Sequence, residues 1–228
     1  CKACGTEITH GEVIPAAGHR YRNGACTVCG AKDPRWSGTE RPWNDPFRDV
    51  RASDWFYSGV KFAYQHGLFQ GTAADMFSPD EPMTRAMLVT VLWRMDGKPS
   101  AAGGSSFTDV PRGQWYTEAV AWAAENGVVN GVGGGKFEPD GNVTREQIAT
   151  ILYRYAGLRG VPTGGRADLG SFPDGGAVSG WAYDALSWAN AAGLIAGTRE
   201  GGVDYLAPQQ NATRAQVAVI LMRYLGAA

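Results

Sequence analysis

Four cysteines near the start of the chain have the type and spacing of a metal site. They form two CxxC pairs, Cys1 with Cys4 and Cys26 with Cys29, and glycine follows each second cysteine. Each pair can place two sulfur atoms on one side of a tight turn, and four thiolates hold Zn²⁺ tetrahedrally. A segment this short has almost no core, so the metal would supply its folding free energy. We predict a zinc-ribbon-like segment over 1–32, with Zn²⁺ as a structural cofactor.

Two disulfides are the alternative for these cysteines, because the location inferred below is extracellular. A catalytic zinc is not expected, since a closed four-cysteine site keeps no position open for water. We interpret His10 and His19 as surface residues rather than metal ligands. Nucleic-acid binding is not expected either, because the basic residues of this segment are scattered and the formal net charge of the chain is −1.

After residue 46 one pattern of aromatic, acidic, glycine and basic residues occurs three times, roughly every 60 residues. Each copy runs from a Phe-x-Asp motif to a tryptophan, two glycines, an x-Pro motif and Thr-Arg. The members are Phe47, Asp49, Trp55, Gly67, Gly71, Phe77, Pro79, Thr84 and Arg85; Phe107, Asp109, Trp115, Gly127, Gly131, Phe137, Pro139, Thr144 and Arg145; and Phe172, Asp174, Trp181, Gly193, Gly197, Leu206, Pro208, Thr213 and Arg214. A period of this length indicates a supersecondary unit used in tandem.

Each copy is expected to contain two helices joined by an extended loop. Small apolar residues at helical spacing follow Phe-x-Asp, and a glycine ends that first helix. Thr84, Thr144 and Thr213 are predicted N-caps of the second helix; Gln147 and Gln216 complete capping boxes. The second helices carry apolar stripes at i, i+3, i+4 and i+7. The stripes are Leu88, Val91, Leu92 and Met95; Ile148, Ile151, Leu152 and Tyr155; and Val217, Ile220, Leu221 and Tyr224.

A unit of about 55 residues with two short helices exposes too much apolar surface to be stable alone. Three such units can bury that surface against one another. We therefore predict a mainly α fold with three lobes around a shared central helix bundle. The predicted boundaries are 33–46 for a linker and 47–98, 107–160 and 172–228 for the three repeats. Trp36 and Trp43 suggest that the linker packs against another part of the protein.

The remaining composition restricts the location and the kind of protein. No apolar run approaches the roughly 20 residues that span a bilayer, so membrane insertion is not expected. Residue 1 is Cys1 rather than methionine, and no signal-peptide pattern follows it. We interpret the chain as a segment of a longer polypeptide.

The three copies resemble tandem S-layer homology modules, over roughly residues 47–225. The motifs that carry the resemblance are Phe-x-Asp-Val, Trp-aromatic, the paired glycines, Phe-x-Pro and Thr-Arg, in the same order three times. The resemblance implies a pseudo-threefold, three-pronged arrangement that anchors a bacterial surface protein non-covalently to the cell wall. The implied partner is secondary cell-wall polysaccharide attached to peptidoglycan, often with a pyruvylated amino sugar, bound in grooves between neighbouring lobes. The implied location is extracellular, in the cell wall or S-layer.

This chain departs from the family pattern at two places. The family's Thr-Arg-Ala-Glu motif ends here in Met87, Gln147 and Gln216, so its acidic last position is missing in all three copies. The third Phe-x-Asp copy lacks its valine and runs into Gly175 and Gly176. We therefore expect the third groove to follow the family pattern least.

The resemblance implies that the recurring residues bind carbohydrate. A pyruvate ketal carries a carboxylate, which suits the bidentate fork of arginine, and free N–H groups at a helix start also favour an anion. Tryptophan offers an apolar face to a sugar ring, aspartate can accept sugar hydroxyls or hold an arginine, and glycine permits close approach. The predicted site residues are Arg85, Arg145 and Arg214; Trp55, Trp115 and Trp181; Asp49, Asp109 and Asp174; and Gly71, Gly131 and Gly197.

Each of these residue types also has a structural interpretation. The tryptophans can be core residues, the aspartates can cap the first helices, and the glycines can serve positive φ angles. The arginines can form ion pairs with the aspartates, although a surface ion pair contributes only about 0–1 kcal/mol.

Two rival functions follow from the same residues. The repeats can form a structural or self-assembly module that makes lattice contacts with other surface proteins. Catalysis is not expected, because His10, His19 and His66 lie outside the repeated motifs and no nucleophile–base arrangement is visible. The carboxylates that recur belong to the repeat pattern rather than to a glycosidase pair.

Overall fold

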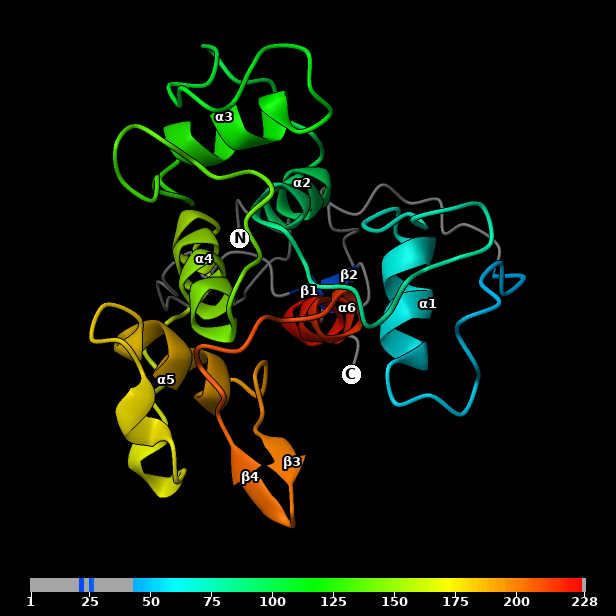
Figure 1. The fold of residues 1–228 in the computed structure, drawn as a ribbon, viewed down its shortest axis with the longest axis vertical. Helices are drawn as coiled ribbons and strands as arrows, with labels where there is room; N and C mark the ends of the chain where they lie inside the picture. The colour runs from blue at the N-terminus through cyan, green and yellow to red at the C-terminus, as the bar shows by residue number, and fades with distance from the viewer. Residues whose placement is uncertain (1–20, 23–24, 27–42, 227–228) are drawn as a thin grey trace, which may run out of the picture.

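The computed structural model describes residues 21–22, 25–26 and 43–226 (Figure 1). This part of the chain is mainly helical, as predicted, with two small antiparallel sheets. The helices are α1 (Tyr57–Gln65), α2 (Arg85–Met95), α3 (Thr117–Glu125), α4 (Arg145–Leu158), α5 (Tyr183–Ala191) and α6 (Arg214–Tyr224), with two 3₁₀-helices, η1 (Leu169–Ser171) and η2 (Gly175–Ala177). None of the helices described is both long and apolar enough to cross a bilayer.

The predicted zinc-ribbon-like segment lies mostly outside the described residues. Its described pieces, β1 (Tyr21–Arg22) and β2 (Ala25–Cys26), pair antiparallel. Cys1, Cys4 and Cys29 lie outside the described residues, so zinc and two disulfides both stay predictions. Elsewhere in the described part, no group of three or more His, Cys, Asp or Glu residues is placed to hold a metal ion.

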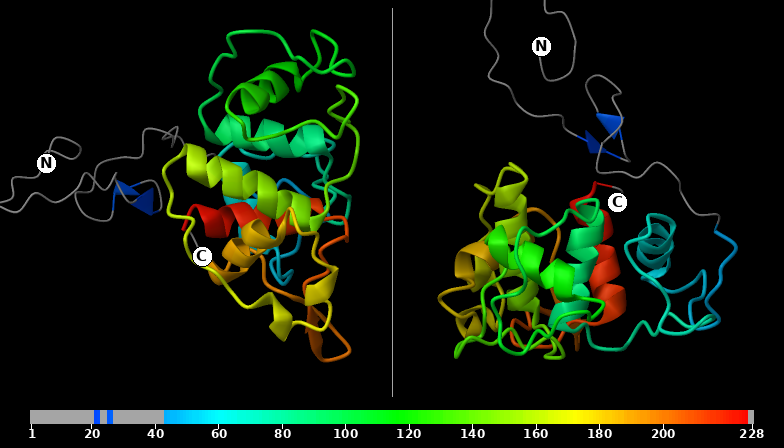
Figure 2. Two further views of the ribbon diagram at one scale, coloured as in Figure 1. Left: turned by 90° about the vertical axis from the view of Figure 1, so that its left-hand side faces the viewer. Right: turned by 90° about the horizontal axis from the view of Figure 1, so that it is seen from above.

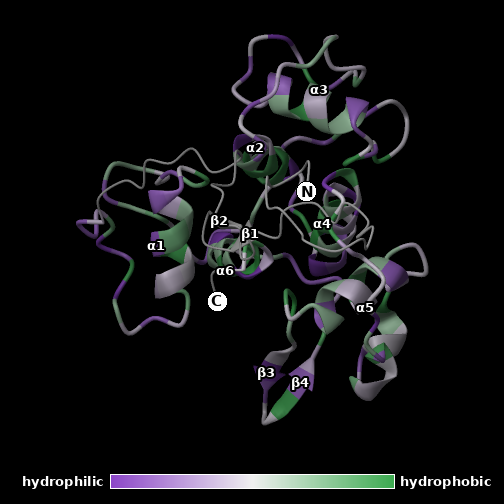
Figure 3. Cartoon of the chain, turned by 180° about the vertical axis from the view of Figure 1, so that it is seen from behind, coloured by the Kyte–Doolittle hydropathy of each residue, from purple (hydrophilic) through white to green (hydrophobic). Residues whose placement is uncertain are grey.

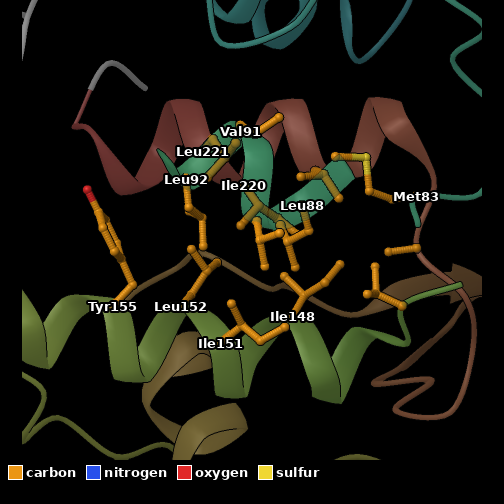
Figure 4. Close-up of a cluster of buried hydrophobic side chains, with 14 of the residues drawn as sticks. Met83, Leu88, Val91, Leu92, Ile148, Ile151, Leu152, Tyr155, Ile220 and Leu221 are labelled. Carbon is orange, nitrogen blue, oxygen red and sulfur yellow. The ribbon is translucent and has the colours of Figure 1, made fainter. Parts of the chain in front are cut away.

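The second helices of the three repeats, α2, α4 and α6, form the centre of the molecule (Figures 1 and 2). Their apolar stripes are buried as the spacing predicts, apart from the half-buried Tyr224, and Leu88, Leu152 and Leu221 are each at 0% exposure. Figure 4 shows side chains from all three helices pointing toward one another. In Figure 3 the hydrophobic residues of these helices gather around the middle of the molecule. Burial of this shared core is the main favourable contribution to the fold.

Each first helix packs against the second helix of another repeat. Helix α3 contacts α2, α5 contacts α4, and α1 contacts α6. Gly59 on α1 shows how closely the helices approach, because a Cβ atom there would lie 2.6 Å from the Val219 side chain and 2.9 Å from its backbone. The small residues on the first helices thus serve close packing, as predicted, and the first repeat closes against the third.

The predicted helix boundaries are set by local chemistry. Thr84, Thr144 and Thr213 each accept a hydrogen bond from the backbone N–H three residues later. Gln147 and Gln216 complete capping boxes, whereas the first repeat lacks the reciprocal bond, as its Met87 requires. The loops between the helices contain only short strand pieces, including β3 (Thr198–Glu200) and β4 (Val203–Tyr205).

The predicted linker contributes to packing at its described end. Trp43 is half-buried, and its Nε1–H donates to the Tyr57 hydroxyl at 2.9 Å. Its ring also meets Tyr64 edge-on, with centroids 5.8 Å apart. Trp43 therefore packs on α1, as predicted, and Trp36 lies outside the described residues.

The segments that enter α2, α4 and α6 exchange backbone hydrogen bonds in a closed ring. The N–H of Met83 donates to the Ala212 carbonyl at 2.8 Å, that of Ala212 to Val143 at 2.9 Å, and that of Val143 to Met83 at 2.9 Å. All three side chains are fully buried. Because a buried N–H without a partner is costly, each repeat depends on the other two.

We expect Gly59→Ala to lower the free energy of unfolding by about 1–3 kcal/mol, because the new methyl group meets the backbone of Val219. The matched control is Gly157→Ala on the exposed end of α4, where a Cβ meets nothing within 4 Å. That change should raise stability by about 0.5–1 kcal/mol. Urea unfolding followed by circular dichroism measures both values, and equal effects would contradict the close approach of α1 to α6.

Candidate functional site

The recurring aspartates each hold a turn of their own repeat that ends in proline, here called the x-Pro turn. These turns are Phe77–Pro79, Phe137–Pro139 and Leu206–Pro208. The Asp109 carboxylate accepts from the backbone N–H groups of Phe137 and Glu138, both at 2.8 Å. Asp49 and Asp174 make the same pair of bonds. The middle residue of each turn is left-handed, with φ of 57° at Glu138, and successive N–H groups in such a turn surround an anion. The capping interpretation is wrong, since α1, α3 and α5 have no side-chain cap.

The recurring arginines connect each repeat to the next one. Arg85 donates from Nε to the Phe137 carbonyl at 2.7 Å and from Nη2 to the Asn130 carbonyl at 3.1 Å. Arg145 reaches repeat 3 in the same way, and Arg214 reaches back to repeat 1, which closes the cycle. Their acceptors are Leu206 and Ala196 for Arg145, and Phe77 and Gln70 for Arg214. These carbonyl partners, rather than aspartate ion pairs, supply the structural role.

The backbone N–H groups at the starts of these helices are already paired. The N–H of Arg85 donates to the Gly141 carbonyl and that of Ala86 to the Pro139 carbonyl, both at 2.9 Å. The third N–H bonds to the Thr84 cap. Helices α4 and α6 make the same bonds to repeats 3 and 1. The prediction that these helix starts offer free N–H groups to an anion is therefore wrong, because carbonyls of the following repeat occupy them.

The three guanidinium groups are buried yet remain charged. Exposure is 7% for Arg85, 5% for Arg145 and 6% for Arg214. Burial lowers the pKa of all three groups, in Arg214 to about 10, which still leaves the charge in place at neutral pH. The Arg85 guanidinium lies 4.6 Å from the centre of the Phe137 ring, a cation–π contact. The two carbonyl bonds use two of the five N–H bonds of each group.

Two clefts open beside these arginines, and each takes residues from all three repeats. The first, here the Arg85 cleft, has a volume of about 450 Å³; the second, the Arg145 cleft, about 550 Å³. The Arg85 cleft is lined by Arg85, Val129, Asn130, Gly131, Val132, Gln147, Thr150, Ile151, Arg154 and Trp181. The Arg145 cleft is lined by Trp55, Arg145, Leu194, Ile195, Ala196, Gly197, Thr198, Arg199, Gln216, Val219, Ile220 and Arg223. The larger cleft is thus built mainly from repeat 3, which departs most from the shared pattern.

The tryptophans are exposed rather than buried. Exposure is 66% for Trp55, 57% for Trp115 and 59% for Trp181, so the core interpretation is wrong. Trp181 lines the Arg85 cleft and Trp55 lines the Arg145 cleft. Each of these clefts therefore combines a buried cation with an exposed aromatic ring from another repeat.

The glycines before the hairpin loops allow the chain to close on itself. A Cβ atom at Gly131 would lie 2.6 Å from the Lys136 carbonyl oxygen and 2.9 Å from the Phe107 ring. Gly71, Gly131 and Gly197 do not have positive φ angles, so that interpretation is wrong for them. Gly131 and Gly197 also each line a cleft.

The structure brings together only part of the predicted set. Arginine, tryptophan and glycine meet in each cleft, but the aspartates line neither one. Arg214, Trp115 and Gly71 also line neither of the two clefts described. The binding role of the predicted residues therefore stays a prediction.

Two further arginines line the clefts and are absent from the predicted set. Arg154 lies in the Arg85 cleft and Arg223 in the Arg145 cleft. Both occupy the same position of the second helix, as does Arg94 in the first repeat. The recurrence of arginine at this position in all three copies is the feature of the sequence that could have identified them.

Both clefts are positively charged. Among the residues that the structure describes, two arginines line the Arg85 cleft and three line the Arg145 cleft, where β3 adds Arg199, and no acidic residue lines either cleft. Arginine binds carboxylate and phosphate groups through paired hydrogen bonds. The arrangement therefore suits an acidic ligand with an apolar face for the aromatic ring.

Comparison with known proteins gives a consistent family match. The S-layer homology domain matches residues 46–86, 106–149 and 171–218, one stretch for each repeat. Similar proteins include an endoglucanase from Bacillus sp. (strain KSM-635), 31% identical over 180 residues, which are 79% of this chain and 19% of the endoglucanase. A surface-layer 125 kDa protein from Lysinibacillus sphaericus is 32% identical over 173 residues, 76% of this chain and 14% of that protein. The S-layer protein sap of Bacillus anthracis is 33% identical over 113 residues, 46% of this chain and 13% of that protein. The chain thus spans less than a fifth of these relatives.

We expect Asp109→Asn to lower the free energy of unfolding at pH 7. The side-chain amide has one oxygen and one NH₂ group, so it can accept only one of the two N–H bonds of the turn. Burial raises the pKa of Asp109, but the N–H groups of Phe137 and Glu138 outweigh it and hold the pKa below its ordinary value. The carboxylate therefore adds stability above the unfolded pKa, near 3.9, and this contribution is lost as the pH falls through the folded pKa.

Urea unfolding of both proteins at pH 7 and pH 3 measures this contribution. The difference in free energy of unfolding between wild type and Asp109→Asn should be smaller at pH 3 than at pH 7. Asp140→Asn, which changes an exposed carboxylate, should differ little from wild type at either pH. A gap of the same size at both pH values would contradict the role given to the Asp109 charge.

Proposed function

The chain belongs to the S-layer homology domain family, a family of cell-surface, cell-wall-associated modules, and we propose that it anchors a bacterial surface protein non-covalently to the cell wall. The ligand is secondary cell-wall polysaccharide with an acidic, pyruvylated sugar. One observation carries the proposal: each described cleft combines a buried arginine, a second arginine and an exposed tryptophan, with no acidic residue.

The clefts suit an acidic sugar because their cations are already oriented. Two carbonyls hold the guanidinium of Arg85, so binding a carboxylate costs little side-chain entropy. Arg154 adds a second donor on the same cleft, and Trp181 offers its face to the apolar side of a sugar ring. The Arg145 cleft repeats this arrangement with Arg223 and Trp55.

The cyclic contacts between repeats support the pseudo-threefold, three-pronged arrangement that the family resemblance implies. Each arginine of the Thr-Arg motif bonds to the following repeat, and Arg214 bonds to the first. Such a closed assembly presents its clefts at the joints between repeats. A chain with more than one cleft can bind a polymer at several points, which raises its overall affinity.

Anchoring rather than catalysis is the role proposed for this chain. The endoglucanase relative shares 19% of its length with it, so the activity in that name is a statement about that protein. The family is an anchoring module, and we propose that the chain serves as the anchor within a longer polypeptide.

A structural or self-assembly role in an S-layer is the alternative. Two relatives are named as S-layer proteins, and Trp115 is exposed although it lines neither described cleft. An exposed aromatic residue is common at protein–protein contacts. In this alternative the module makes lattice contacts with other surface proteins.

Sedimentation with purified wall sacculi separates the two functions. We expect the chain to sediment with intact sacculi and to remain in solution after chemical removal of the secondary polysaccharide. Binding that survives this removal would favour the protein-contact alternative.

The double variant Arg154→Ala, Arg223→Ala tests the clefts with little damage to the fold. Alanine at Arg85 or Arg145 would remove two hydrogen bonds to carbonyls of the next repeat, whereas Arg223 donates one long bond, to the Leu194 carbonyl at 3.4 Å, so the second arginines are the better targets. Each charge-assisted hydrogen bond contributes about 1.5–3 kcal/mol, so binding to sacculi should weaken at least roughly tenfold per cleft.

The matched control removes an exposed arginine outside both clefts. Arg112→Ala changes the net charge as each single substitution does, and should bind like wild type. Raising the salt concentration should weaken wild-type binding, because exposed charge interactions are screened. If the double variant sediments as well as the control, the clefts are not the anchoring site.

A further inference from the structure

A buried glutamate at the start of α4 has no counterpart in the other repeats. Glu146 is 2% exposed, and alanine occupies the same position in α2 and α6, as Ala86 and Ala215. A buried carboxylate is costly unless several donors compensate for its lost hydration. The function described so far does not use Glu146, so its partners indicate what it does.

Within the described part of the chain, all three donors to the Glu146 carboxylate come from repeat 3. The Ser179 backbone N–H donates to Oε2 at 3.0 Å, and the Ser179 hydroxyl donates to Oε1 at 2.9 Å. The Gln209 side-chain amide donates to Oε1 at 2.8 Å. The carboxylate therefore ties the first turn of α4, in repeat 2, to two separate segments of repeat 3.

Ser179 begins the turn on which a cleft tryptophan lies. The Ser179 carbonyl accepts from the N–H of Ala182 at 2.9 Å, and Trp181 lies between these two residues. Ala182 is fully buried, so the turn is anchored at its far end by packing and at its near end by Glu146. Trp181 between these anchors lines the Arg85 cleft.

The corresponding turns of the first two repeats hold themselves with local side chains. In repeat 1 the Asp54 carboxylate accepts from the Arg51 N–H at 2.7 Å, next to Trp55. In repeat 2 the Thr117 hydroxyl accepts from the Gln114 N–H at 3.0 Å, next to Trp115.

At the position of Asp54, repeat 3 has no side chain that could accept a backbone hydrogen bond of the turn. Gly180 stands where repeat 1 has Asp54, and Gly175 and Gly176 precede it in η2. Backbone rich in glycine has more conformational freedom to lose. The anchor for this turn therefore comes from outside the repeat, and Glu146 supplies it.

We propose that Glu146 is a positioning residue for the Arg85 cleft: it fixes the turn Ser179–Ala182 so that Trp181 is held as the wall against which the sugar ring of an acidic glycan packs. This inference rests on the proposed function and adds to it the residue that makes one cleft competent. The Arg145 cleft does not depend on Glu146, because its tryptophan comes from repeat 1.

Tryptophan labelled with fluorine and observed by ¹⁹F NMR tests the inference in the whole chain. The Trp181 and Trp55 signals, assigned with Trp181→Phe and Trp55→Phe, report the two clefts separately in one titration. The probe is a pyruvylated N-acetylhexosamine. In wild type, both signals should shift as the sugar is added.

In Glu146→Ala we expect the Trp181 signal of the free protein to move or broaden, and the affinity at Trp181 to fall about 5- to 20-fold. The affinity at Trp55 should stay within about twofold. Glu146→Gln should rescue most of the loss, because its carbonyl oxygen can accept while the Ser179 hydroxyl and the Gln209 amide reorient. An unchanged Trp181 signal and affinity in Glu146→Ala would overturn the inference.

A matched pair of serine variants decides the question if Glu146→Ala does not fold. Ser179→Ala removes one bond to Glu146, whereas Ser53→Ala removes an exposed serine at the same distance before Trp55. Weaker binding at Trp181 in the first variant, with no change at Trp55 in the second, supports the proposal, and equal behaviour overturns it. If neither tryptophan responds to the sugar in wild type, the proposed function fails and this inference fails with it. If both tryptophan signals respond to the sugar in wild type, but the Glu146 and Ser179 variants bind it at Trp181 as wild type does, the inference alone fails.

Discussion

The N–H groups that begin α2, α4 and α6 find their acceptors in the following repeat, and those of the third repeat find them in the first. Each Asp of the Phe-x-Asp motif holds an x-Pro turn, and that turn presents two carbonyls to the helix start and the arginine of the repeat before it. Because the three arginines and the residues that follow them at the helix starts are buried, a repeat that loses its neighbour leaves several polar groups unpaired. The cycle of three is therefore the unit that folds.

The joints between repeats are also where the clefts lie. Arg85 and Arg145 hold the joints through two carbonyls and still line the clefts, so one side chain serves assembly and, in the proposed function, ligand binding. A cation that the fold has already oriented loses little entropy when it meets a carboxylate. Because each cleft lies at a joint of the cycle, residues of all three repeats line it. For the same reason Glu146, from repeat 2, can set the place of Trp181, from repeat 3.

Local features could be predicted well because local chemistry decides them. The threonine caps, the two capping boxes, the missing box at Met87 and the apolar stripes all depend on residues within a few positions of one another. The roles of the residues that recur in all three repeats could not be predicted in the same way. Asp109 as a clamp, Gly131 against the Phe107 ring and the occupied helix starts each depend on contacts between segments far apart in the chain.

By itself the sequence determined that three like units of two helices each exist, where the first helices end and the second helices begin, and which faces are apolar. Only the tertiary structure decided that α1 packs on α6 and closes the cycle, that all three tryptophans are exposed, and that Trp55 and Trp181 line clefts built mainly by other repeats. The physical reason is that helical spacing and capping are properties of neighbouring residues. The partner of a buried N–H or guanidinium is chosen among every carbonyl that the whole fold brings within reach.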